Sequence, residues 1–119
     1  MKTALLIDDS AYMRTLLNLL ISMHDLVVIG EAENGKIGVE KYKELKPDIV
    51  FMDIMMEEMS GLEALRQIIE YDPGAVVVVV SSMMQQRFFI EDAMSFGAKA
   101  VLTKPPNESN IAELLAKLF

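Results

Sequence analysis

Five short apolar runs recur along the 119-residue chain at nearly even spacing, and this spacing limits the possible folds more than any other feature. The runs are Ala4–Ile7, Val27–Ile29, Ile49–Met52, Ala75–Val80 and Ala100–Thr103. They are rich in β-branched residues, and their first residues stand 22 to 26 positions apart. Each interval can hold a strand, a loop and a helix, so the chain is predicted to consist of repeated strand–helix units around a parallel sheet.

Between the runs, apolar residues recur at the i, i+3, i+4 and i+7 positions of one helix face. Five such stripes predict five helices, over Met13–Leu20, Val39–Leu45, Leu62–Ile69, Phe89–Met94 and Ile111–Leu118. Ser10 or Asp9 is placed to cap the first helix, and Ser60-Gly-Leu-Glu63 has the spacing of a capping box before the third. Gly97 is expected to end the fourth helix.

Five units are too few for an eight-stranded barrel, which typically needs about 250 residues. They suit a doubly wound, flavodoxin-like α/β fold with a five-stranded parallel sheet of order 2-1-3-4-5 and five flanking helices. Right-handed crossovers would place these helices on both faces of the sheet. No linker or low-complexity tract interrupts the pattern, so we expect residues 1–119 to form a single domain.

Composition excludes several kinds of partner. The formal net charge is -7, whereas binding to nucleic-acid phosphates requires clustered lysine and arginine. The longest apolar run, Ala75–Val80, is far shorter than a membrane span, and the first residues do not resemble a signal peptide. Cysteine is absent, which fits a reducing compartment. We therefore expect a cytoplasmic protein that neither crosses a membrane nor binds nucleic acid directly.

Polar side chains follow four of the five predicted strands. Asp8 and Asp9 follow the first strand, Asp53 the third, Ser81 the fourth and Lys104 the fifth. In an open α/β sheet, ligands bind in the crevice outside the carboxyl ends of the strands, and the expected order makes the first and third strands neighbours. Three carboxylates should therefore converge there, with a hydroxyl and a lysine beside them.

Each of these residues also has an ordinary structural explanation. Asp53 could simply end a strand, and Asp8-Asp9 could cap the helix that follows. Ser81 could be a turn residue and Lys104 a surface residue. Because all four strand ends supply groups that suit one kind of chemistry, we favour a common site.

That chemistry is phosphoryl transfer. Crowded carboxylates repel one another, and a hard cation such as Mg²⁺ removes this repulsion. An aspartate can act as a nucleophile and form an aspartyl phosphate, while the cation and a lysine neutralise the transferred oxygens. The sequence has no Walker motif to hold ATP, so the expected donor is a phosphorylated protein or a small phosphoryl compound.

Taken together, these residues resemble the receiver domain of two-component response regulators, particularly the single-domain chemotaxis (CheY-like) type. The resemblance covers essentially the whole chain. It is carried by Asp8-Asp9, Asp53, Met59-Ser60-Gly61, Ser81, Gly97-Ala98 and Lys104-Pro105. It implies a signalling switch rather than an enzyme, because such a domain catalyses only its own phosphotransfer and autodephosphorylation.

The resemblance also implies how the phosphoryl group and the metal are held. Asp53 would accept the phosphoryl group from a sensor histidine kinase. Mg²⁺ would be bound by Asp9, Asp53 and the backbone carbonyl of Met55, with Asp8 acting mostly through water.

Further implied features concern the other strand ends. Ser81 and Lys104 would contact the phosphoryl oxygens, and the Lys104–Pro105 peptide bond would be cis. Phosphorylation would draw Ser81 and its loop inward and rearrange the face formed by the fourth helix, fifth strand and fifth helix. That face would then change its binding to a downstream protein target.

Some positions depart from the family pattern. Glu57 stands where proline is usual, Val101 where a switching tyrosine or phenylalanine is usual, and Ser82 where alanine is usual. Coupling between the site and the output face therefore cannot use an aromatic rotamer change. The interval from Ser81 to Lys104 is slightly longer than is common, which leaves the start of the fourth helix open.

Five methionines gather near the expected site, in what we predict to be the two loops beside it. They are Met55, Met56, Met59, Met83 and Met84. They could fill gaps flexibly, form a partner-docking surface, or, through Met55 and Met83, form an apolar rim that hinders water and prolongs the phosphorylated state. Docking would gain support if Phe88 or Phe89 were exposed.

Two other functions fit parts of the pattern. One is a Mg²⁺-dependent phosphohydrolase with an aspartyl nucleophile. Such enzymes typically carry a second acid two residues after the nucleophile, where this chain has Met55. The other is an interaction module that is never phosphorylated, against which the acids, Ser81 and Lys104 argue.

Overall fold

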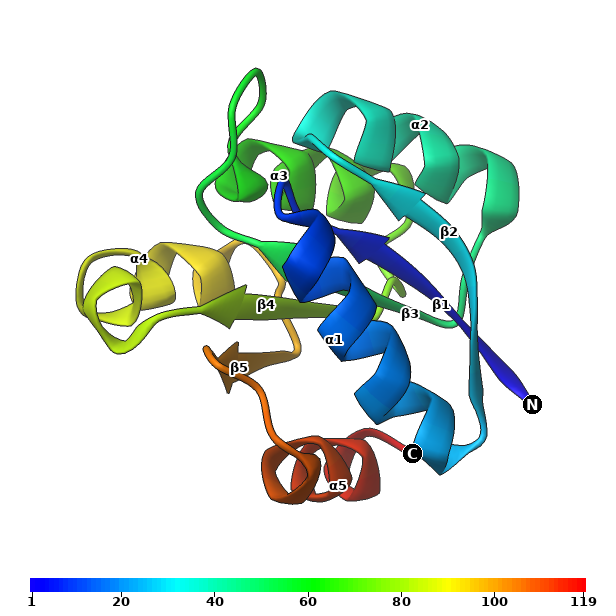
Figure 1. The fold of residues 1–119 in the computed structure, drawn as a ribbon. Helices are drawn as coiled ribbons and strands as arrows, with labels where there is room; N and C mark the ends of the chain where they lie inside the picture. The colour runs from blue at the N-terminus through cyan, green and yellow to red at the C-terminus, as the bar shows by residue number, and fades with distance from the viewer.

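A computed structural model describes residues 1–119 and shows one five-stranded parallel sheet with helices on both faces (Figure 1). The strand order is β2-β1-β3-β4-β5, and every pairing is parallel. The strands are β1 (Lys2–Ile7), β2 (Leu26–Ala32), β3 (Ile49–Asp53), β4 (Val77–Ser81) and β5 (Ala100–Thr103). The predicted α/β class and strand order are confirmed.

Five helices and one short 3-10 turn connect the strands. They are α1 (Ala11–Ile21), η1 (Ser22–His24), α2 (Gly35–Leu45), α3 (Gly61–Tyr71), α4 (Met83–Ser95) and α5 (Glu108–Leu118). Residues of α1 and α5 pack in the core on one face of the sheet, and residues of α2, α3 and α4 pack in the core on the other (Figure 1). None of the helices has both the length and the apolar character needed to cross a membrane.

The central strand β3 explains why its sequence is a continuous apolar run. All five of its residues are buried. Val50 and Met52 point into the core beneath α2 and α3, whereas Ile49 and Phe51 belong to the core beneath α1 and α5. Since successive side chains of a strand point to opposite faces, a strand covered on both sides must be apolar at every position until its end. Asp53 is the residue at that end.

Helix α4 departs most from its predicted form. It begins at Met83, so Met83 and Met84 lie in its first turn, and their predicted placement in a loop is wrong. Only Ala93 of this helix is buried, and Met94, predicted to face the core, is 46% exposed. Besides Ala93, Phe89 packs partly buried against the core, so few residues of the helix contact the core.

Helix caps resolve two questions that the sequence left open. Ser10 caps α1, because its hydroxyl accepts a hydrogen bond from the Met13 N–H at 3.2 Å. The start of α4 is fixed by a reciprocal capping box between Ser82 and Gln85.

The predicted capping box before α3 forms only in part. Ser60 accepts a hydrogen bond from the Glu63 N–H at 3.3 Å, as the spacing predicts. The Glu63 side chain does not return the bond, because it pairs with Arg66 at 2.6 Å instead. The reason is local competition: a residue three positions along the helix offers a charged donor.

Gly61 allows α3 to begin directly against the end of β3. A Cβ atom at this position would collide with the backbone of Asp53 and Ile54. The Gly61 N–H donates to the Ile54 carbonyl at 2.8 Å, which closes the loop that follows Asp53. This close approach fixes where the Asp53 side chain leaves the sheet.

We expect Gly61→Ala to lower the free energy of unfolding by about 1–3 kcal/mol, since the backbone must move to admit the methyl group. Urea denaturation provides the measurement. Gly74→Ala is the matched control, because an added Cβ there meets only the Asp72 carboxylate at 3.5 Å. Equal stability of the two variants would show that the contact at Gly61 is not tight.

Candidate functional site

Three carboxylates meet where β1 and β3 end. Asp8 follows β1 directly, Asp53 is the last residue of β3, and Asp9 lies beside them. Each offers an oxygen atom, and these three atoms lie within 4.8 Å of one another. Asp8 and Asp53 are buried, while Asp9 is exposed. The structure thus brings together the acids that were predicted to converge.

Lys104 supplies the positive charge at the same place. Its Nζ lies 3.2 Å from Asp53 Oδ1 and 3.3 Å from Asp8 Oδ2. The residue follows β5, and its backbone N–H donates to the Ser81 carbonyl at 2.9 Å, which ties it to the end of β4. The Lys104–Pro105 peptide bond is cis, as predicted.

One lysine does not neutralise two buried carboxylates. Burial raises the pKa of Asp53, the Lys104 charge opposes this rise, and the Asp8 charge adds to it, so that the pKa remains raised. Asp8 Oδ2 is buried without a hydrogen bond of proper geometry, although Lys104 is near. An excess of buried negative charge and a buried carboxylate oxygen that accepts no hydrogen bond fit a site for a divalent cation.

Ser81 completes the predicted set. It is the last residue of β4, is only 1% exposed, and its Oγ has no hydrogen-bond partner. A buried hydroxyl without a hydrogen-bond partner costs about 1–3 kcal/mol, so binding of a ligand oxygen that accepts a hydrogen bond from it would be favoured. The hydroxyl is thus free to donate a hydrogen bond at the carboxyl end of β4, the strand next to β3.

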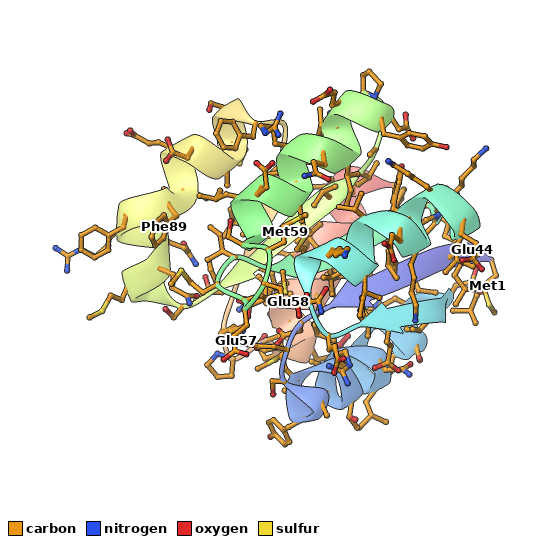
Figure 2. The ribbon with its side chains drawn as sticks, turned by 90° about the horizontal axis from the view of Figure 1, so that it is seen from above. Met1, Glu44, Glu57, Glu58, Met59 and Phe89 are labelled. Atoms are coloured by element: carbon orange, nitrogen blue, oxygen red, sulfur yellow. The ribbon has the colours of Figure 1, made fainter.

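The loop between β3 and α3 covers part of the site. The Met55 N–H lies 3.4 Å from Asp53 Oδ1, and Glu58 adopts a left-handed backbone conformation with φ of 66°. Figure 2 shows Glu57 and Glu58 on the side of the loop near the start of α1, and Met59 between α3 and α2. A metal-binding role for the Met55 carbonyl stays a prediction.

The five methionines separate into two groups. Met56 and Met59 are partly buried and pack against the core, which supports gap filling for these two. Met55 is 51% exposed and Met83 is 67% exposed, and Met84 is exposed as well. Phe88 is 72% exposed, so the condition set for a docking surface is met.

Sequence reasoning missed acidic and polar residues around Asp9. A hollow of about 300 Å³ is lined only by polar residues, namely Asp9, Glu33, Asn34, Glu57 and Glu58. Glu33 and Asn34 follow the end of β2. The rule that assigned functional residues to the other strand ends would have found them, had it been applied to the second strand. They make the approach to the site more acidic.

Comparison with known proteins gives one consistent family. The response regulator receiver domain family matches residues 4–116. Chemotaxis protein CheY of Thermotoga maritima is 48% identical over 117 residues, which cover 98% of this chain and 97% of the relative. Chemotaxis protein CheY of Listeria monocytogenes is 46% identical over 113 residues, which cover 95% and 94% of the two chains.

Solved structures agree with this result. The response regulator domain of Thermotoga maritima CheB is similar with a TM-score of 0.85 and 36% identity, over 99% of this chain and 93% of that one. A chain of the CheX-CheY-BeF3-Mg+2 complex from Borrelia burgdorferi is similar with a TM-score of 0.92 and 28% identity. That match covers 99% of this chain and 89% of the other.

We expect Asp53→Asn to raise the free energy of unfolding at pH 7, without divalent cations, by an amount on the order of 1 kcal/mol, because it removes an incompletely neutralised buried charge. The pKa of Asp53 is raised in the folded state, so protonation of Asp53 stabilises the fold at low pH and this contribution is lost as the pH rises. The difference between variant and wild type should therefore shrink as the pH approaches about 4.

Urea denaturation at several pH values measures this effect. Asp48→Asn serves as a control of opposite sign, because a hydrogen bond from the Thr3 N–H lowers the pKa of Asp48. Its carboxylate stabilises the fold above the ordinary carboxyl pKa, and the variant should be less stable than wild type at pH 7. An Asp53→Asn variant less stable than wild type would mean that Lys104 compensates the buried charge fully.

Proposed function

This chain belongs to the response regulator receiver domain family, and on that premise we propose that it is a phosphorylation-dependent signalling switch that accepts a phosphoryl group on Asp53. The convergence of Asp53 with Asp8, Asp9 and Lys104 at one edge of the sheet carries this proposal. The chemotaxis proteins among its relatives favour a role in a two-component chemotaxis system.

In the proposed reaction, the Asp53 carboxylate attacks the phosphorus of a phosphohistidine on a sensor histidine kinase. A new oxygen–phosphorus bond forms, the phosphorus–nitrogen bond breaks, and the imidazole leaves with the electron pair and takes up a proton. Lys104 is close enough to Asp53 for its ammonium group to contact an oxygen of the phosphoryl group and neutralise its charge. The Ser81 hydroxyl, which has no hydrogen-bond partner, would donate a hydrogen bond to another phosphoryl oxygen.

We propose that the cation is Mg²⁺, which neutralises phosphoryl oxygens when it is bound. Asp8, Asp9, Asp53 and the Met55 carbonyl would hold it. The raised pKa of Asp53 and the unpartnered Asp8 oxygen support a cation at this place. The CheX-CheY-BeF3-Mg+2 complex from Borrelia burgdorferi, one chain of which is similar to this one, adds support.

The output would be read on the face formed by α4, β5 and α5. Met84 and Phe88 are exposed on α4, and a hollow of about 440 Å³ lies along β5 and α5 between Lys99 and Lys117. Exposed apolar side chains on one element of this face and a hollow along the other two suit a protein target. We propose that phosphorylation changes binding of such a target in the cytoplasm.

We propose that this chain is not an enzyme with turnover. Two residues after Asp53, where aspartyl phosphohydrolases typically carry a general acid, stands Met55, which cannot transfer a proton. Hydrolysis would then depend on water reaching the acyl phosphate without assistance from an acid at that position.

Incubation with acetyl phosphate and Mg²⁺ tests the phosphoacceptor. We expect intact-mass measurement to show one added phosphoryl group on the wild type and none on Asp53→Asn. Removal of Mg²⁺ by a chelator should abolish the modification, because the crowded acids would then oppose an anionic donor. Equal modification of Asp53→Asn would place the acceptor elsewhere and refute the proposal. Continuous phosphate release at many turnovers per protein would favour the phosphohydrolase.

The apolar rim of Met55 and Met83 makes a kinetic prediction. If these exposed side chains hinder water, Met55→Asn and Met83→Glu should each shorten the lifetime of the phosphorylated protein severalfold. Loss of the phosphoryl group can be followed by mass after the donor is removed. Met94→Glu is the matched control, because Met94 is also exposed but lies at the opposite end of α4. Unchanged lifetimes in both rim variants would rule out the rim.

A further inference from the structure

One side chain of α4 contacts the ends of both neighbouring strands. The Gln86 amide Nε2 donates to Thr103 Oγ1 at 2.9 Å and lies 3.3 Å from the Ser81 carbonyl oxygen, to which it also donates. Ser81 and Thr103 are paired across β4 and β5 and are the last residues of these strands. A single amide group therefore joins α4 to two strands at the edge of the site.

The hydroxyl and the backbone carbonyl of Ser81 have different surroundings. Its buried hydroxyl has no partner, whereas its carbonyl accepts hydrogen bonds from Gln86 and from the Lys104 N–H. Rotation of the hydroxyl alone would reach a nearby ligand without any effect on α4. A displacement of the Ser81 backbone, in contrast, would pull directly on the Gln86 amide.

Other contacts of α4 are poorly suited to transmit such a displacement. Ala93 is the one buried residue of this helix and Phe89 packs partly buried against the core, and both contacts are apolar and without a fixed direction. The capping box between Ser82 and Gln85 is local to the first turn, with the Gln85 side chain accepting from the Ser82 N–H at 2.9 Å. Val101 of β5 packs against the core and has no polar group to offer α4. Polar contact with both strand ends is thus made by Gln86.

We propose that Gln86 is a positioning residue that couples Ser81 to α4 and to the end of β5. It provides this coupling in a chain that has Val101 instead of an aromatic residue. This inference rests on the proposed switch function. When Ser81 is drawn toward a phosphoryl oxygen, its carbonyl shifts relative to Thr103. The Gln86 amide, bonded to both, makes α4 and β5 respond together.

The test uses beryllofluoride with Mg²⁺ as a phosphoryl analogue and follows backbone amides by NMR in Gln86→Met, which keeps the length of the side chain but removes the donor. The variant loses both hydrogen bonds of the amide, and because the one to the Ser81 carbonyl is long, the combined loss should weaken a two-state coupling about fivefold. We therefore expect analogue-induced shift changes in α4 to fall about fivefold, while those of Asp53 and Ser81 persist and the analogue still binds within about twofold.

Two further variants separate coupling from general damage. Gln85→Met is the matched control: it removes an amide from the same turn without touching β4 or β5, and it should keep the response of α4. Thr103→Val removes only the hydroxyl on β5 and preserves the shape of the side chain. It should weaken the response of the β5 amides, which keep the bond from the Lys104 N–H to the Ser81 carbonyl, and it should preserve that of α4, because the bond from Gln86 to the Ser81 carbonyl remains.

The outcomes are distinguishable. A full α4 response in Gln86→Met overturns the proposal, as does an equal loss in Gln85→Met, which would indicate general weakening of the helix. If Gln86→Met fails to fold, Thr103→Val decides, and an unchanged β5 response overturns the coupling. A wild type in which Asp53 and its neighbours show no response to the analogue would refute the switch function itself, and the coupling with it.

Discussion

The buried charge at the end of β3 is the constraint on which the rest of this structure depends. Two carboxylates, Asp8 and Asp53, are buried beside a single lysine, and the pKa of Asp53 is raised as a result. Burying a charge that is not fully paired is costly, so the surrounding fold must supply the stability. It does so with the central strands β1, β3 and β4, most of whose residues are apolar and buried on both faces.

The same arrangement explains how the site would respond to ligands in the proposed switch. A cation would relieve the repulsion between the acids, and a phosphoryl oxygen would give the Ser81 hydroxyl the partner it lacks. The acids and the Ser81 hydroxyl lie at the ends of strands that the sheet holds in place. The elements that would have to move are α4, which buries one residue, and the loop after Asp53. Rigid strands with weakly held neighbours are the combination expected of a two-state element.

Several features that the sequence did not predict lie in α4. Met83 and Met84 were placed in a loop, but the capping box of Ser82 and Gln85 draws them into α4. Met94 was placed in the core, yet α4 sits too loosely on the sheet to bury it. The Met94 prediction assumed that every apolar residue of the stripe packs against the core, whereas Ala93 is the one residue of α4 that is fully buried. The contacts of Gln86 could not be predicted for another reason. The hydrogen-bond partners of a helical amide depend on which strands the helix packs against.

The sequence by itself determined the sheet, its order and the residues gathered at its edge. Apolar runs such as those of β3 and β4 are satisfied by burial on both faces, and the acids, Ser81 and Lys104 then emerge at the carboxyl ends of the strands. Only the tertiary structure decided how strongly those groups act on one another. The distance of 3.2 Å from Lys104 to Asp53, the burial of the Ser81 hydroxyl and the link from Gln86 to Thr103 join residues far apart in the chain. Such contacts depend on how the strands and helices pack, which no local pattern of residues records.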